Sequence, residues 1–257
     1  MHVKDLFNLE GKTAIITGGG RGLGQQIAES LAEAGANIVV CSRKVEACEE
    51  TAESLLKKDV QALALPCDVS KQEDVQRVID ETIARMGSVD ILVNNSGASW
   101  GAPTLDMPLD KWEKVMAVNA TGTFLFSQAA AKHMVKQKYG KIINIASTAG
   151  LHGSPAGTLD AIGYSSSKGA VLAFTRDLAV KLAPDNIQVN AIAPGFFPTK
   201  MSKGVLEKIG DSYLEKTPAK RFGSDRDMKG AALFLASASS DYIIGHTLVV
   251  DGGVTVS

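Results

Sequence analysis

The stretch Thr17-Gly18-Gly19-Gly20-Arg21-Gly22-Leu23-Gly24 decides the fold of this 257-residue chain. It follows a short apolar run, residues 13–17, and opens a segment, residues 23–34, whose apolar side chains recur at helical spacing. Glycines at such a turn let the backbone approach a pyrophosphate, and the helix N-terminus offers free N–H groups and a partial positive charge. The turn therefore predicts a dinucleotide site, although its Gly18, Gly22, Gly24 spacing also suits a flexible connection.

Strand and helix continue to alternate along the chain. Short β-branched runs predict strands at 13–17, 38–41, 91–93, 141–146, 189–193 and 247–250, and longer segments predict helices at 23–34, 45–57, 72–86, 109–136 and 164–182. Nearly continuous apolar character is typical of parallel strands buried on both faces. We predict one Rossmann-type α/β domain over residues 1–257, with a doubly wound seven-stranded parallel sheet and helices on both faces.

Three irregular stretches follow strand ends, at about 99–108, 151–163 and 196–217. Open α/β sheets bind their ligands beyond the carboxyl ends of the strands. We therefore expect these stretches to be the substrate loops.

Composition excludes several classes of protein. The 27 Lys and Arg residues balance 28 Asp and Glu residues, unlike the basic footprint of a nucleic-acid-binding protein. The first residues do not resemble a signal peptide, and the absence of a long apolar stretch predicts no membrane association. Three cysteines without C-x-x-C spacing indicate a reduced, cytoplasmic protein, and the four histidines lack the spacing of a metal site.

The end of the second predicted strand bears on the choice of dinucleotide. An NAD-binding fold usually places a carboxylate there for the ribose 2′-hydroxyl, whereas this chain has Ser42 followed by Arg43 and Lys44. With Arg21 near the phosphates, these cations suit a 2′-phosphate, because guanidinium binds phosphate in a bidentate manner. We predict NADP(H) in preference to NAD(H); the alternative is that the cations only solvate the start of a helix.

Tyr164 and Lys168 stand four residues apart at the start of a predicted helix, so both side chains can share one face. A free tyrosine titrates near 10, and a nearby cation favours its phenolate. Lowering that pKa by about 3 requires about 4 kcal/mol, which a lysine and an oxidised nicotinamide together can supply. Taken alone, the pair is better explained as a Tyr and a Lys on an exposed helix surface, because this spacing is common by chance.

Taken together in chain order, the motifs make the sequence resemble the short-chain dehydrogenase/reductase family over almost its whole length. They comprise the T-G-x-x-x-G-x-G turn, Asp68-Val69, Asn94-Asn95-Ser96-Gly97, Asn119, Ser147, Tyr164 with Lys168, Pro194-Gly195 with Thr199, and Asp251-Gly252-Gly253. The resemblance implies an enzyme that interconverts a ketone and a secondary alcohol by hydride transfer to or from a nicotinamide cofactor.

The resemblance implies four catalytic residues. Tyr164 would be the general acid in reduction and the base in oxidation, and Lys168 would lower its pKa and hold the nicotinamide ribose. Ser147 would hydrogen-bond the substrate carbonyl and stabilise developing oxyanion charge. Asn119 would hold a water that relays protons to Lys168.

It also implies a cofactor site at the carboxyl ends of the strands. Asp68 and Val69 would flank the adenine, Asn95 and Gly97 would approach the adenosine ribose, and Pro194 to Thr199 would cradle the nicotinamide. The full expected set is Gly18, Arg21, Gly22, Leu23, Gly24, Ser42, Arg43, Asp68, Val69, Asn95, Gly97, Tyr164, Lys168, Pro194, Gly195, Phe197 and Thr199.

The chain departs from the family pattern in two places. Ser96 replaces the usual alanine, a small-for-small change. Ser147 and Tyr164 are 17 residues apart where the family commonly shows about 13. The added residues lie within 151–162 and should border the substrate. The substrates of relatives with shorter loops are therefore a poor guide to the substrate of this chain.

Several functions and assemblies remain open at this point. The pattern most resembles 3-oxoacyl-thioester reductases, with gluconate 5-dehydrogenase-like sugar-acid enzymes as the alternative. A non-catalytic cofactor-binding scaffold or redox sensor is a third candidate, and a methyltransferase would not explain the Tyr164–Lys168 pair. The family implies a homotetramer, or possible homodimer, built through helices 109–136 and 164–182 and the C-terminal strand, acting on a small-molecule substrate.

Overall fold

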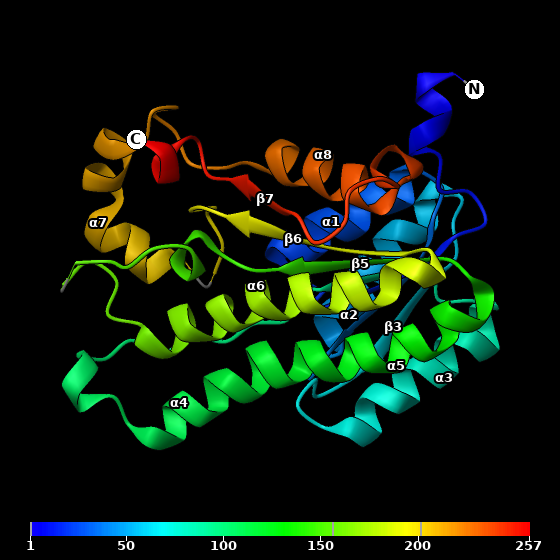
Figure 1. Ribbon diagram of the computed structural model, residues 1–257, viewed down its shortest axis with the longest axis horizontal. Helices are drawn as coiled ribbons and strands as arrows, with labels where there is room; N and C mark the ends of the chain where they lie inside the picture. The colour runs from blue at the N-terminus through cyan, green and yellow to red at the C-terminus, as the bar shows by residue number, and fades with distance from the viewer. Residues whose placement is uncertain (1, 156, 201) are drawn as a thin grey trace.

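The strands form one sheet in the order β3-β2-β1-β4-β5-β6-β7, with every neighbouring pair parallel (Figure 1). The computed structural model describes residues 2–155, 157–200 and 202–257. The strands are β1 (Thr13–Thr17), β2 (Asn37–Ser42), β3 (Ala62–Pro66), β4 (Ile91–Asn94), β5 (Gly140–Ile145), β6 (Ile187–Pro194) and β7 (Thr247–Val250). The strand order reverses between β1 and β4, which is where such sheets open their ligand crevice.

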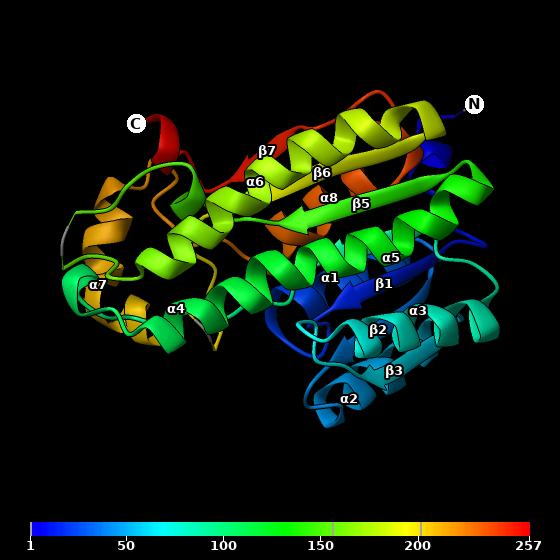
Figure 2. The same ribbon diagram turned by 60° about the horizontal axis from the view of Figure 1, so that its bottom comes forward.

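Helices cover both faces of the sheet (Figure 2). One face carries α1 (Gly22–Glu33), α2 (Glu46–Leu55) and α8 (Asp225–Ala236), and the other carries α3 (Gln72–Met86), α4 (Leu109–Met116), α5 (Gly122–Gln137) and α6 (Ile162–Leu182). The remaining helix, α7 (Lys203–Lys216), lies beyond the carboxyl ends of the strands, beside the C-terminal segment (Figure 1).

Each central strand feeds two hydrophobic cores. Along β1, Ile15 packs toward α3 and α5, whereas Ala14 and Ile16 pack toward α1 and α8, and all three are fully buried. Successive side chains of a strand point to opposite faces, so a strand covered on both sides must be apolar throughout. The continuous apolar runs in the sequence have this cause, and the predicted doubly wound seven-stranded sheet is confirmed.

Element boundaries agree well with the sequence-based expectations. Strands β1 and β7 and helix α3 have the predicted bounds, and the other predicted strands shift or lengthen by a few residues. The predicted helix 109–136 is interrupted by a π-helical turn, Ala117–Thr121, between α4 and α5.

No residue range was predicted for strand β3, and two helices were not predicted. Residues 196–217, expected to be irregular, contain α7, and α8 begins at a capping box formed by Ser224 and Asp227. That Ser-x-x-Asp signal was available in the sequence. Ala156 and Met201, within the second and third expected loops, lie outside the described residues.

Two further features concern the chain as a whole. Among the described residues, no helix is both long and apolar enough to cross a membrane. The cysteines are all unpaired and buried, with Cys41 and Cys48 fully covered and Cys67 exposed by only 2%.

Candidate active site

The glycine turn between β1 and α1 is shaped by close backbone contacts. Gly18 and Gly22 have φ angles of +67° and +58°, a region that side chains disfavour. A Cβ atom added at Gly24 would lie 2.4 Å from the Gly18 carbonyl oxygen. Leu23, between them, is partly buried and packs against the core beneath α1. The turn therefore forms a backbone cradle at a helix N-terminus, which fits the pyrophosphate of a dinucleotide.

The end of β4 is tied to this turn. The Thr17 hydroxyl oxygen accepts hydrogen bonds from the Asn95 and Ser96 N–H groups, both at 3.0 Å. The Asn95 side chain donates to the carbonyl oxygens of Thr17 (2.9 Å) and Gly18 (3.2 Å). Gly97 follows Ser96 and precedes Ala98, whose backbone is hydrogen-bonded to the Asn119 side chain. The two strands on either side of the crevice thus share one hydrogen-bond network.

Of the predicted 2′-phosphate residues, Ser42 and Arg43 lie at the tip of β2 and Arg21 lies in the glycine turn before α1. The Ser42 hydroxyl donates to the Lys44 carbonyl at 2.6 Å, and the Arg21 and Arg43 side chains are exposed. Burial raises the pKa of Asp68, but hydrogen bonds from Ser70 and the charge of Arg43 outweigh it, so the pKa lies below its usual value. Arg43 is therefore near the residue expected to flank the adenine.

Tyr164 and Lys168 lie in the first two turns of α6. Lys168 is 4% exposed, its Nζ lies 5.6 Å from the Tyr164 ring centre, and it donates to the Ile145 carbonyl at 2.6 Å. Burial lowers the pKa of Lys168 to about 8. Burial also raises the pKa of Tyr164, while the Ser147 hydroxyl lowers it in part. The pair is not the exposed helix surface that the sequence also allowed.

Ser147 follows β5 and caps a short 3₁₀ turn, Thr148–Gly150, where its Oγ accepts from the Ala149 N–H at 3.2 Å. Gly150 brings this turn against α6, because a Cβ atom there would lie 2.7 Å from the Lys168 carbonyl carbon. The β5 turn and the first turns of α6 are therefore packed directly together, which sets Ser147 beside Tyr164.

Asn119 lies in the π-helical turn and is buried. Its side-chain oxygen accepts from the Ala98 N–H at 2.7 Å, and its amide donates to the Ala98 carbonyl and to the Ser167 hydroxyl, both at 2.9 Å. Ser167 in turn donates to the Tyr164 carbonyl at 2.7 Å. Asn119 thus connects the segment after β4 to the helix that carries Tyr164. The sequence analysis did not single out Ser167, although it stands one turn after Tyr164.

The end of β6 reaches the glycine turn from the other side. Pro194 ends the strand, and the Gly195 N–H donates to the Val250 carbonyl at 2.9 Å. A Cβ atom at Gly22 would lie 3.4 Å from Thr199 Cγ2, so Thr199 lies across from the dinucleotide turn. Phe197 is 5% exposed and belongs to the core under α8. The backbone of Phe197 is therefore better placed than its buried ring to contact a cofactor.

The remaining predicted residues lie at the same edge of the sheet. Val69 packs against the start of α5, where a Cβ atom at Gly122 would lie 2.8 Å from its Cγ2. The first two expected loops are joined by the Ala102 N–H, which donates to the Asp160 carbonyl at 2.8 Å. In the described part of the chain, no group of three His, Cys, Asp or Glu residues is arranged to hold a metal ion.

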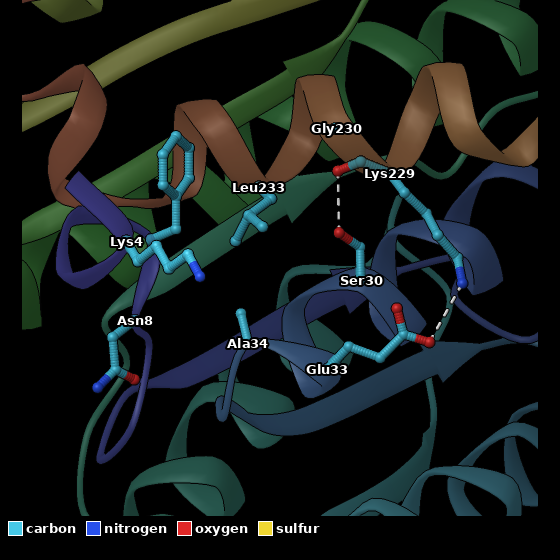
Figure 3. Close-up of a pocket in the computed structure, with 9 residues that line it drawn as sticks. Lys4, Asn8, Ser30, Glu33, Ala34, Lys229, Gly230 and Leu233 are labelled. Atoms are coloured by element: carbon cyan, nitrogen blue, oxygen red, sulfur yellow. Dashed lines mark hydrogen bonds and ion pairs between the residues drawn. The ribbon is translucent and has the colours of Figure 1, made fainter.

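A separate cavity of about 400 Å³ lies between the N-terminal segment, α1 and α8 (Figure 3). Two of its lining charges pair, because Lys229 contacts Glu33 at 3.3 Å, and Lys229 also contacts Glu29 at 3.2 Å. The Ser30 hydroxyl donates to the Lys229 carbonyl at 2.9 Å. None of the predicted site residues lines this cavity, so it is distinct from the candidate active site.

Comparisons with known proteins agree with this geometry. A family model described as Enoyl-(Acyl carrier protein) reductase matches residues 18–255. The chain is 40% identical over 257 residues to the 5-keto-D-gluconate 5-reductase of Escherichia coli K12 (99% of this chain, 100% of the relative). It is 38% identical over 249 residues to the 3-oxoacyl-[acyl-carrier-protein] reductase of Aquifex aeolicus (96% and 99%).

Solved structures extend the agreement to the fold. A gluconate 5-dehydrogenase from Burkholderia cenocepacia, in complex with NADP and tartrate, superposes with a TM-score of 0.94 at 40% identity over 100% of both chains. A short-chain type dehydrogenase/reductase from Mycobacterium marinum gives a TM-score of 0.95 at 37% identity, again over 100% of both chains. The chain therefore belongs to the short-chain dehydrogenase/reductase family and is an NAD(P)-dependent oxidoreductase acting on CH–OH and C=O groups.

Proposed function

We propose that this protein is an NADP(H)-dependent carbonyl reductase in which Tyr164 transfers the proton and Lys168, Ser147 and Asn119 complete the site. The observation that carries the proposal is the contact between buried Lys168 and partly buried Tyr164, held beside Ser147 at the carboxyl edge of the sheet. The dinucleotide cradle of Gly18 to Gly24 opens at the same edge.

In this mechanism the residues act on the carbonyl oxygen. The bound nicotinamide supplies the hydride in reduction and accepts it in oxidation. Ser147 donates a hydrogen bond to the substrate oxygen, and Tyr164 gives that oxygen a proton as negative charge develops on it. Burial keeps Tyr164 protonated at neutral pH, and the Lys168 cation stabilises the phenolate left behind.

In this proposal the side-chain amide of Asn119 does not bind the relay water. Both polar atoms of its side chain are occupied by Ala98 and Ser167. A water that relays protons to Lys168 would therefore bind to backbone carbonyls of the π-helical turn, where the regular helix hydrogen bonding is interrupted. Asn119 would hold that turn in place.

For the cofactor we propose Gly18, Gly22, Leu23 and Gly24 at the pyrophosphate, and Arg21, Ser42 and Arg43 at the 2′-phosphate. The exposed guanidinium groups of Arg43 at the β2 tip and of Arg21 in the glycine turn, without a carboxylate where a 2′-hydroxyl would be bound, support NADP(H). Asp68, Val69, Asn95 and Gly97 would hold the adenosine, and Lys168, Pro194, Gly195, Phe197 and Thr199 the nicotinamide riboside.

For the substrate we propose a 3-oxoacyl thioester or a similar ketone whose reacting end is uncharged, bound by residues 99–108, 151–163 and 196–217. Two cations near these loops are already paired: Lys111 contacts Asp110 at 2.6 Å and lies 4.9 Å from the Trp100 ring centre, and Arg221 contacts Asp227 at 2.6 Å. A sugar acid needs a cation for its carboxylate, yet relatives named for 5-keto-gluconate and gluconate keep that class as the second candidate.

We further propose a cytoplasmic homotetramer. The outward face of α5 and α6 carries exposed apolar side chains, with Phe124 43% and Val180 73% exposed. Strand β7 pairs only with β6 along its described length, and Val249 on it is 37% exposed. An open apolar edge of this kind is a template for pairing with another chain. Buried thiols without disulfide bonds agree with a reducing compartment.

The first experiment measures oxidation of NADPH and of NADH with acetoacetyl-CoA and with 5-keto-gluconate, side by side. Turnover of the thioester with NADPH supports the proposal. Turnover of the sugar acid alone would contradict the substrate class, and a preference for NADH would contradict the roles of Arg21 and Arg43.

Tyr164→Phe tests the enzymatic function directly. It should lower kcat by about 100- to 10,000-fold, because the proton donor is lost, while NADPH binding measured by fluorescence is kept. Tyr242→Phe is the control, since Tyr242 is fully exposed. Turnover by Tyr164→Phe at the wild-type rate would overturn the assignment, as would a protein that binds NADPH but reduces no carbonyl compound.

Arg43→Ala tests the cofactor preference. The loss of one charge-assisted contact should weaken NADPH binding by about tenfold or more and leave NADH binding nearly unchanged. The two dissociation constants are measured by titration, with Arg85→Ala on α3 as the control. Equal weakening of both cofactors would contradict a 2′-phosphate contact.

A further inference from the structure

Tyr213, on the last turn of α7, reaches back to the segment that follows β6. Its hydroxyl oxygen accepts a hydrogen bond from the Phe196 N–H at 3.3 Å. Its ring meets the Phe196 ring edge-on, with centres 4.7 Å apart and planes at 86°, and stacks on Phe222 at 6.1 Å and 13°. These contacts place one aromatic side chain between α7 and the residues proposed to hold the nicotinamide.

Gly195 is enclosed by the same side chain. A Cβ atom at Gly195 would lie 2.9 Å from the Tyr213 hydroxyl and 2.9 Å from the Cα and Cβ of Asp251. Asp251 is itself fixed, because its carboxylate accepts from the N–H groups of Gly253 (2.9 Å) and Thr255 (2.8 Å). The turn after β6 is therefore held between the C-terminal segment and Tyr213.

Both ends of α7 return to this turn. At the N-terminal end, the Ser202 hydroxyl donates to the Phe197 carbonyl at 2.6 Å. At the C-terminal end, fully buried Thr217 donates to the Tyr213 carbonyl through its N–H (2.9 Å) and its hydroxyl (2.7 Å). The Gly223 N–H donates to the Phe196 carbonyl at 3.0 Å. Tyr213 is thus well anchored at its own backbone, and its side chain can fix the position of Phe196.

We propose that Tyr213 is a positioning residue whose hydroxyl holds the Gly195–Phe197 turn in place for the nicotinamide end of the cofactor. This inference rests on the proposed function, in which Pro194 to Thr199 bind that end. The pyrophosphate and the adenosine would be held by Gly18 to Gly24 and by Asn95, and Asn95 has its own hydrogen bonds to Thr17 and Gly18. The hydroxyl should therefore affect one half of the dinucleotide and not the other.

Tyr213→Phe separates the two halves, because it removes the hydroxyl and keeps the ring stacked between Phe196 and Phe222. Binding of NADPH and of adenosine 2′,5′-bisphosphate, which lacks the nicotinamide half, is measured by calorimetry. We expect NADPH to bind about three- to tenfold more weakly, as for the loss of one hydrogen bond, with the bisphosphate unchanged. Tyr242→Phe, at a fully exposed tyrosine, should change neither.

Phe222→Leu is the second variant. It removes the stacked ring and keeps the Tyr213 hydroxyl, so NADPH should bind within about twofold of wild type. Equal loss of NADPH affinity in Phe222→Leu and Tyr213→Phe would overturn the inference, because packing and not the hydroxyl would then be responsible. Unchanged NADPH binding in Tyr213→Phe, or equal weakening of both ligands, would also overturn it. Failure of the unsubstituted protein to bind either ligand would instead contradict the proposed cofactor, and this inference with it.

Discussion

Burial of the Lys168 ammonium destabilises the folded state of the protein without cofactor. Lys168 is 4% exposed, and its ammonium has one hydrogen-bond partner among the described residues, the Ile145 carbonyl. Burial lowers its pKa from 10.5 to about 8. The unfolded chain therefore holds a proton on this lysine more strongly than the folded chain, and the penalty is complete below pH 8. Such a cost at a functional position is a recognised trade between stability and activity.

Replacing this lysine should stabilise the cofactor-free protein. The difference between a pKa of 10.5 and one of about 8 corresponds to about 3 kcal/mol of unfolding free energy at pH 7. Loss of the hydrogen bond to Ile145 offsets about 1 kcal/mol of this gain. Lys168→Met should therefore raise the free energy of unfolding by about 2 kcal/mol at pH 7. The gain should shrink as the pH rises from 8 toward 10.5, because wild type gains stability in that window. Urea unfolding at pH 7 and 9.5 measures this.

Lys57→Met, at an exposed lysine on the turn after α2, is the control and should change the unfolding free energy little at either pH. A less stable Lys168→Met at pH 7 would contradict the prediction. The sequence identified Tyr164 and Lys168, since i, i+4 spacing on a helix is a local property. It could not identify Ile145 as the acceptor, because that contact depends on how α6 packs against β5.

At the scale of elements, the π-helical turn between α4 and α5 is a feature that the hydrophobic pattern of the sequence could not predict. The apolar spacing through 109–136 is continuous, so it predicts one helix, and the extra residue in the turn leaves no mark on that pattern. The turn is stabilised by Asn119 through tertiary contacts with Ala98 and Ser167. Helix α7, which lies beyond the carboxyl ends of the strands, was not predicted, although Val205, Ile209 and Tyr213 recur at helical spacing within it.

Asn119→Ala should destabilise the protein by about 2 to 4 kcal/mol, because it leaves the N–H and carbonyl of Ala98 without their buried partner. Denaturant unfolding measures the change. Asn8→Ala is a matched control: Asn8 is exposed and accepts one local hydrogen bond, from the Glu10 N–H at 2.9 Å, so its loss should cost less than about 1 kcal/mol. Similar values for the two variants would show that Asn119 does not hold the turn.

For the molecule as a whole, the doubly wound, seven-stranded parallel sheet was predicted from the sequence, whereas the character of its outer surface was not. Alternating strands and helices with short connections allow few topologies, and these place the carboxyl ends of β1, β4, β5 and β6 together. Whether the apolar side chains on the outer face of α5 and α6 are exposed depends on which other chains pack against them as well as on the sequence itself. The apolar face there, with Phe124 packed edge-on against Phe174 at 6.3 Å, is the surface proposed to bury a second copy.

Ala173→Arg on the exposed side of α6 should disrupt that assembly. A long cation at a close helix contact costs both packing and desolvation. Sedimentation should show the mass falling from four chains to two, with the fold intact by circular dichroism. Ala238→Arg, at another exposed alanine, should remain tetrameric. A monomeric wild-type protein, or a tetrameric Ala173→Arg, would refute the proposed interface.

The covered thiols of Cys41, Cys48 and Cys67 have a practical consequence for spectroscopy. Maleimide dyes react with accessible thiols, so the native chain should take up very little label. A cysteine introduced at Leu105, whose side chain is 98% exposed in the first expected substrate loop, would then be labelled almost alone. Fluorescence from that one dye could follow the loop during turnover without removing any native cysteine.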